Sequence, residues 1–127
     1  MPRVIIKLFR DERGRSPVMD WLADAGKRSR KVTELAFAHV QELRDYGHEL
    51  RRPAAAPLRD GIYELRLRYG SVQYRLLYFF SGRDAVVISH GLSKEDTIPT
   101  REIELAIKRR ALYLSDPERY TFTLEED

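Results

Sequence analysis

Two arginines in the middle of the chain have the most readily defined chemistry. Arg66 and Arg75 lie in neighbouring segments whose β-branched, aromatic and alternating residues are typical of strands. If Gly70 and Ser71 form a two-residue hairpin loop, Arg66 lies opposite Arg75. Facing guanidinium groups repel each other. A sheet accepts that cost most readily where the pair meets an anion, and the commonest extended anion is a nucleic-acid backbone.

The same pairing separates apolar residues from basic ones. It places Leu65 opposite Leu76 and Leu67 opposite Tyr74 on one face of the sheet, and it leaves the arginines on the other face. A slip of one residue would mix the two sets, so the pattern favours this register strongly.

A third predicted strand, 84–90, brings a histidine toward the arginines. If a two-residue turn precedes it, His90 lies opposite Arg75, whereas a three-residue turn would bring Ser89 there. His90 could carry a proton near neutral pH, which arginine does not do because it stays protonated. Lys94, in the predicted loop after this strand, is a second candidate if its pKa is lowered.

These residue types can cut RNA without a metal ion. The 2′-hydroxyl of the RNA can be the nucleophile, and the protein then supplies a base, an acid for the leaving oxygen and cations for the charged phosphorane. The predicted catalytic residues are Arg66, Arg75, His90 and Lys94. The predicted RNA-binding residues are Arg68, Gln73 and Tyr69, of which the tyrosine could stack on a base.

A structural role is the alternative for the same residues. Glu64 lies two residues before Arg66 on the same face of its strand, so its carboxylate could neutralise part of the arginine charge. His90 could equally be a hydrogen-bonded structural histidine.

Composition excludes several other classes of chemistry. The chain has no cysteine, and its three histidines form no cluster at metal-ligand spacing, so neither a zinc site nor thiolate chemistry is expected. Phosphate-binding glycine loops are absent, so no cofactor is expected. No apolar run approaches the length of a membrane span, and the lack of cysteine fits a reducing cytoplasm. We therefore expect a cytoplasmic protein without a membrane partner.

The charge is divided unevenly along the 127 residues. Residues 1–115 carry a net charge of +7 and residues 116–127 carry −4. This division predicts a single domain over 1–115 followed by an acidic C-terminal tail over 116–127. A basic domain favours a polyanionic partner.

The order of predicted elements is β-α-α-β-β-β-α. Helical periodicity and terminal signals such as Ser16-Pro17 and Gly47 predict two N-terminal helices, which span 16–26 and 29–46. Two prolines and three alanines make 47–60 a predicted connecting loop, and 120–124 a short strand. A last helix, 99–114, is expected to turn inward Ile103, Ala106, Ile107, Ala111 and Leu114. We therefore expect an α+β fold with a small antiparallel or mixed sheet.

Several segments together resemble the RelE/ParE toxin superfamily, most closely its phage-derived HigB-like branch. The resemblance covers about residues 3–114. It is carried by Gly61-Ile-Tyr-Glu-Leu-Arg66, Tyr74-Arg-Leu-Leu-Tyr78, His90-Gly-Leu-Ser-Lys94 and the helix beginning Pro99-Thr-Arg-Glu-Ile-Glu.

The resemblance implies a RelE-like fold and a bacterial toxin–antitoxin module. RelE-like toxins cleave mRNA in the ribosomal A site without a metal ion and leave a cyclic phosphate. HigB-like toxins are neutralised by a helix-turn-helix antitoxin, and they reach operator DNA only through the complex with that antitoxin. The ribosome, mRNA and such an antitoxin are therefore the implied partners.

The resemblance also implies roles for individual residues. Arg75 matches the arginine that stabilises the transition state, Arg66 matches a basic residue on the preceding strand, and Lys94 falls near a residue that acts on the leaving group. Glu64 stands where RelE-like members carry a lysine. Tyr113 and Tyr120 are the two candidates for a C-terminal tyrosine found in some members.

Two other functions use the same fold. A ParE-type toxin binds gyrase without any catalysis, and a decayed toxin would retain only antitoxin pairing and operator control. A fold alone does not choose among these functions.

Overall fold

The structure is a computed structural model that describes residues 3–93 and 97–124 of the chain. Within these residues one mixed sheet of six strands is combined with four α-helices and a 3₁₀ turn, which confirms the predicted α+β class. In chain order the elements are β1 (Ile5–Phe9), α1 (Pro17–Arg28), α2 (Arg30–Tyr46), η1 (Gly47–Glu49), β2 (Ala55–Arg59), β3 (Ile62–Tyr69), β4 (Val72–Ser81), β5 (Ala85–Ser93), α3 (Thr100–Ser115), α4 (Pro117–Tyr120) and β6 (Thr121–Thr123).

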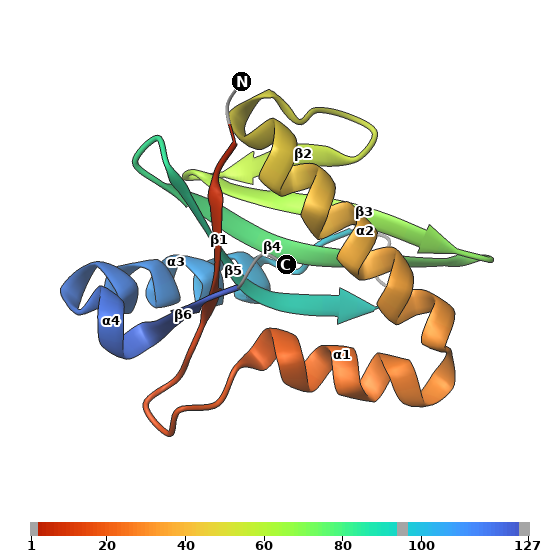
Figure 1. The fold of residues 1–127 in the computed structure, drawn as a ribbon, viewed down its shortest axis with the longest axis horizontal. Helices are drawn as coiled ribbons and strands as arrows, with labels where there is room; N and C mark the ends of the chain where they lie inside the picture. Colours follow the sequence, from red (N-terminus) through yellow and green to blue (C-terminus); the bar gives the residue numbers. More distant parts are fainter. Residues whose placement is uncertain (1–2, 94–96, 125–127) are drawn as a thin grey trace.

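The strands are ordered β2-β3-β4-β5-β1-β6 (Figure 1). β1 runs parallel to β5, and the other neighbouring strands are antiparallel. The long β3–β4 hairpin, which carries both arginines, therefore lies between β2 at one edge and β5 in the middle of the sheet.

The register of the β3–β4 hairpin is the predicted one. Arg66 pairs with Arg75 and Leu65 pairs with Leu76. Gly70, in the turn, has a φ of +62°, a conformation that glycine adopts without steric cost. The two arginines consequently project from the same face of the sheet.

The predicted pairing of β4 with β5 is wrong. Arg75 pairs with Leu92, and His90 pairs with Leu77, so neither His90 nor Ser89 lies opposite Arg75. Two features change the register. The turn between the strands is longer than the predicted two residues, and a β-bulge next to Leu77 inserts one more residue into β5. His90 is therefore displaced along the sheet from the arginine pair.

The prediction that 47–60 is a loop is also wrong in part, because residues 55–59 form β2. The sequence did not indicate this strand because alanine and proline have low strand propensity. Pro57 is accommodated because β2 is an edge strand whose register shifts between Pro57 and Arg59, so the missing N–H group costs little.

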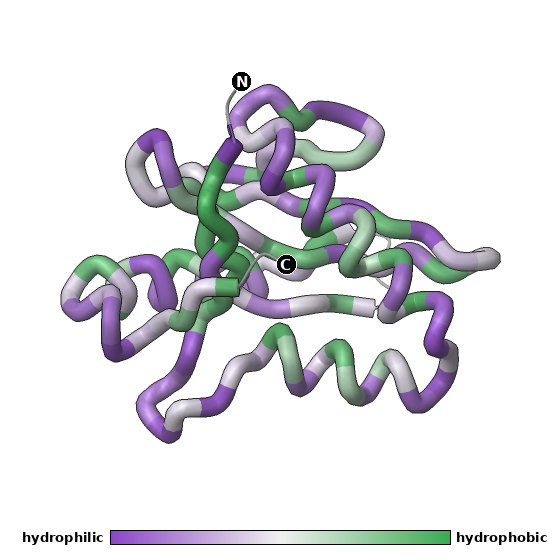
Figure 2. The backbone as a smooth tube through the Cα atoms, in the orientation of Figure 1, coloured by the Kyte–Doolittle hydropathy of each residue, from purple (hydrophilic) through white to green (hydrophobic). Residues whose placement is uncertain are grey.

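Two apolar cores lie on the two faces of the sheet. One core packs α1 and α2 against the sheet through residues that include Val18, Leu22, Val40 and Leu43. The other core lies under α3 and includes Ile103, Ala106 and Tyr113. The hydropathy colouring shows the alternation of polar and apolar residues along both N-terminal helices (Figure 2).

The inward face of α3 was predicted only in part. Ile103 and Ala106 are buried, but Ala111 is exposed and Leu114 is 65% exposed, while Tyr113 is buried instead. Toward its C-terminal end the helix therefore contacts the core through Tyr113 and the partly buried Leu112.

Helix α1 is fixed at its N-terminus and near its middle by specific contacts. The Ser16 hydroxyl accepts a hydrogen bond from the Met19 N–H group at 3.2 Å, which confirms the predicted N-cap. Near its middle, the Trp21 indole N–H donates to Ser93 Oγ at 3.2 Å. The ring lies so close to Gly91 that a Cβ atom built there would be 2.4 Å from it. Glycine therefore allows α1 to approach the end of β5.

The C-terminal segment completes the sheet. β6 pairs with β1, and Tyr120 stacks on Phe9 with ring centroids 6.0 Å apart, so the predicted short strand is confirmed. The segment assigned to an acidic tail thus contributes α4 and β6 to the fold, while residues 125–127 lie outside the described part. No helix among the described residues is both long and apolar enough to cross a membrane.

Candidate functional site

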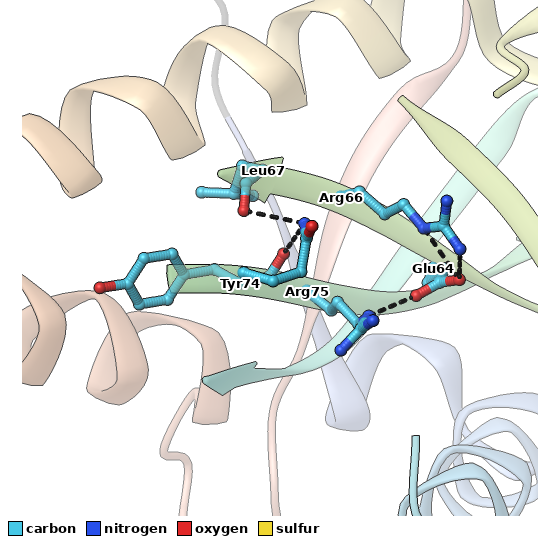
Figure 3. Close-up of polar contacts among 6 residues, drawn as sticks. Glu64, Arg66, Leu67, Tyr74 and Arg75 are labelled. Atoms are coloured by element: carbon cyan, nitrogen blue, oxygen red, sulfur yellow. Dashed lines mark hydrogen bonds and ion pairs between the residues drawn. The ribbon is translucent and has the colours of Figure 1, made fainter. Parts of the chain in front are cut away.

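Glu64 joins the two predicted catalytic arginines (Figure 3). Its Oε1 atom lies 2.8 Å from Arg75 Nε, and its Oε2 atom lies 3.1 Å from Arg66 Nε and 3.0 Å from Arg66 Nη2. The carboxylate therefore lies between the two guanidinium groups and offsets the repulsion that the strand pairing imposes on them.

The three side chains differ in their access to solvent. Those of Glu64 and Arg75 are 5% and 9% exposed, whereas that of Arg66 is 33% exposed. The group carries one net positive charge, and Arg66 is the member that reaches the surface. Removing one partner of a buried ion pair is costly, because the other charge stays shielded from water and loses the attraction that offset this cost.

The burial of Arg75 distinguishes the two roles predicted for the arginines, which are binding of a phosphate and ion pairing with Glu64. An arginine that grips a phosphate must offer donors to solvent, but Arg75 is buried against a carboxylate. The structural alternative, in which Glu64 neutralises arginine charge, therefore describes Arg75 well. Arg66, by contrast, is oriented by Glu64 and can still present donors to an anion.

His90 is buried and hydrogen-bonded through both ring nitrogens. Its Nδ1 atom lies 2.7 Å from Ser89 Oγ, and its Nε2 atom lies 3.0 Å from Glu102 Oε1 at the start of α3. Burial and, less strongly, the charge of Arg109 lower the pKa of His90, while Glu102 opposes that change. In the neutral ring, Nε2–H donates to the carboxylate and Nδ1 accepts from the serine hydroxyl.

The line of Ser89, His90 and Glu102 is not a nucleophilic triad. Ser89 is fully buried, so its hydroxyl cannot reach a substrate. His90 instead connects the end of β5 to the first turn of α3, and Arg109 strengthens that connection by donating to the Ser89 carbonyl at 3.4 Å. Sequence reasoning missed Glu102 and Arg109, because only the packing of α3 on the sheet brings them to His90.

The predicted RNA-binding residues lie on two faces. Arg68 pairs with Gln73 across the hairpin, next to the arginine pair and on its face. The Gln73 amide is directed to its own hairpin, where it donates to the Leu67 carbonyl at 3.2 Å. Tyr69 is 43% exposed and belongs to the opposite face, where it borders a shallow hollow beside α2. Arg68 lines the same hollow as Tyr69, so these two residues could contact one partner together, whereas the Arg66 side chain belongs to the face opposite to that of Tyr69.

The other proposed site residues either are buried or lie outside the described residues. Lys94 lies outside the described residues. Tyr113 and Tyr120 are buried, and the Tyr113 hydroxyl lies 2.8 Å from Ser81 Oγ. Over 3–93 and 97–124, no three His, Asp or Glu side chains are grouped so that they could hold a metal ion.

The fold and the site together define a small α+β protein whose hairpin holds an arginine pair around one carboxylate. The sequence of residues 21–121 matches the family described as phage derived protein Gp49-like (DUF891). This chain belongs to that family, which is part of the RelE/HigB-like toxin family and generally provides the toxin of toxin–antitoxin modules. A search among curated proteins finds no match to the chain.

Proposed function

We propose that this chain is the toxin of a bacterial type II toxin–antitoxin module and that it cuts mRNA on the ribosome. In the proposed reaction the 2′-oxygen of one nucleotide attacks the adjacent phosphorus, and the bond to the 5′-oxygen breaks. The products are a 2′,3′-cyclic phosphate and a 5′-hydroxyl. A helix-turn-helix antitoxin in the cytoplasm would neutralise the toxin.

The observation that carries the proposal is the orientation of Arg66. Its guanidinium group is held by Glu64 through two of its nitrogens, yet one third of the side chain is exposed. A cation that is already oriented and still accessible can stabilise the charge that develops on the phosphorane. Arg75 then acts as a positioning residue, because it fixes the carboxylate that orients Arg66.

Two residues are predicted to transfer protons in this reaction. Lys94 stays a prediction for the leaving-group proton. His90 also stays a predicted proton carrier, but both of its ring nitrogens are engaged, so it would have to break one hydrogen bond to act. Its geometry favours a positioning role between β5 and α3.

A second candidate is a toxin that binds its target without catalysis, as ParE-type proteins bind gyrase. The burial of Arg75 against Glu64 favours this candidate, because a sheet that only binds would also neutralise its inner charges in this way.

Expression of the chain in bacteria without an antitoxin separates the two candidates. The nuclease predicts growth arrest with new mRNA ends inside translated codons and no early SOS response. The gyrase inhibitor predicts an SOS response with intact mRNA. Full-length mRNA in arrested cells would overturn the nuclease proposal.

A further inference from the structure

A basic pocket lies beside the edge strand β2, away from the arginine pair. Its volume is about 520 Å³, and the residues lining it include His48, Arg51, Arg52, Pro57 and Tyr63. The connection from α2 to β2, which supplies most of these residues, arches away from the sheet in Figure 1. Tyr63 projects from the face opposite to that of Glu64, so this pocket and the arginine pair are separate sites.

The charge of this pocket is not neutralised by any residue in the described part of the chain. Arg51 and Arg52 are both exposed, and neither guanidinium forms an ion pair with any residue that the structure describes. Within 3–93 and 97–124, no acidic residue lines the pocket. Two adjacent arginines with free forked donors are suited to phosphate oxygens.

The pocket also offers aromatic surface next to this charge. The exposed His48 ring stacks on Phe80 with centroids 3.7 Å apart and planes 15° from parallel, which holds the imidazole flat. Tyr63 is half-buried and packs edge-on against the same phenylalanine at 5.2 Å. Fixed aromatic planes beside cationic groups are the combination that binds single-stranded nucleic acid, whose bases stack while its phosphates are held by arginine.

The edge strand argues against a peptide as the occupant. A peptide would add to β2 by main-chain hydrogen bonds, but Pro57 has no N–H group and the strand is irregular after it. The edge is thus poorly suited to strand addition, and side chains dominate recognition in this pocket.

We propose that the pocket formed by His48, Arg51, Arg52 and Tyr63 is a second RNA-binding site, which holds the backbone and a base of a single-stranded segment. The identity of the polyanion as RNA rests on the proposed function. The binding itself requires no cleavage, so it can be measured independently of catalysis.

The test uses binding of a short fluorescent oligouridylate whose 2′-hydroxyls are methylated, which prevents cutting by 2′-oxygen attack. The pocket variant is Arg51→Gln with Arg52→Gln. The matched control is Arg28→Gln with Arg83→Gln, which removes the same charge from two exposed arginines elsewhere. Fluorescence anisotropy as a function of salt gives affinity and the number of phosphate contacts.

The pocket variant should lose affinity about tenfold at low salt, because two charge-assisted contacts are removed. The slope of log affinity against log salt concentration should become less steep by about 1.4, which is ~0.7 for each lost phosphate contact. The control should bind nearly as the wild type does.

Equal losses in both double variants would overturn the inference, because general charge would then explain the binding. It would also be overturned if an oligoglutamate of equal charge bound as tightly through Arg51 and Arg52, since the pocket would then recognise acidic peptides. Ribosome-dependent cleavage is assayed separately. A wild type that binds in the expected way but cuts no mRNA would refute the proposed nuclease and leave the pocket assignment standing.

Discussion

Arg75 Nε lies 2.8 Å from Glu64 Oε1, and both side chains are almost completely shielded from water. The second oxygen of the same carboxylate holds Arg66, which is the exposed member of the group. The hairpin thus converts two facing arginines into one internal ion pair and one oriented surface cation. This arrangement makes Glu64 important for stability and, under the proposed function, for activity.

Glu64→Ala should destabilise the protein strongly, because it removes the carboxylate against which the Arg75 guanidinium is buried. The expected loss in the free energy of unfolding is about 3–5 kcal/mol. Urea denaturation followed by circular dichroism measures it.

The control for this prediction is Glu104→Ala. Glu104 is exposed and lies 3.8 Å from Arg59, so its loss should cost no more than about 1 kcal/mol. Equal effects of the two substitutions would show that the Glu64 pair contributes no more than a surface ion pair does.

Gly91→Ala should destabilise the contact between α1 and β5. The new Cβ atom would lie 2.4 Å from the Trp21 ring, so the indole would have to move and would lose its hydrogen bond to Ser93. We expect a loss of about 1–3 kcal/mol, as for overpacked cores. Thermal unfolding and Trp21 fluorescence, which reports the only tryptophan, measure the change.

A double-mutant cycle assigns this effect to the indole. In a Trp21→Ala background the clash is absent, so Gly91→Ala should then cost much less than it does in the wild type. An unchanged cost would mean that the backbone of β5, rather than the ring, rejects the methyl group.

Stability should fall as the pH falls below about 6.5, the ordinary pKa of histidine, partly because of His90. Its pKa is lowered in the folded state, so the unfolded chain binds the proton more readily and acid favours unfolding. The groups facing the ring are Ser89, Glu102 and Arg109. The contribution of His90 is fully present above this pH and is lost as the ring is protonated.

His90→Gln should reduce this pH dependence, since glutamine does not titrate. The free energy of unfolding of the variant should be lower at neutral pH but should change less between pH values of about 7 and 5. Parallel curves for the two proteins would show that the ring does not supply the effect.

The sequence predicted those parts of the fold that depend on local patterns. Alternation and the Gly70 turn were sufficient for the β3–β4 register, and Ser16-Pro17 marked the start of α1. The position of His90 could not be predicted in the same way. A bulge that shifts β5 has no signature in the apolar run Val86–Ile88, where every residue is buried.

The sequence predicted which residues form the candidate site, but it did not predict how deeply each of them is buried. Strand parity placed Glu64, Arg66 and Arg75 on one face. Whether a carboxylate binds those arginines or leaves them accessible to solvent depends on side-chain rotamers and on the packing of α3. The spacing of residues in the sequence determines neither. The hydrogen-bond partner of His90 could not be predicted for the same reason, because Glu102 contacts the ring only when α3 packs on the sheet.

The most direct test is the rate at which the purified protein cuts mRNA bound to ribosomes in a single turnover. Arg66→Gln should fold as the wild type does and cut about 100-fold or more slowly, because a cation at the phosphorane is lost. Arg28→Gln, an exposed arginine on α1, should cut at the wild-type rate. Cleavage by the Arg66 variant at an unchanged rate, with cyclic phosphate ends, would contradict the proposed role of the oriented arginine.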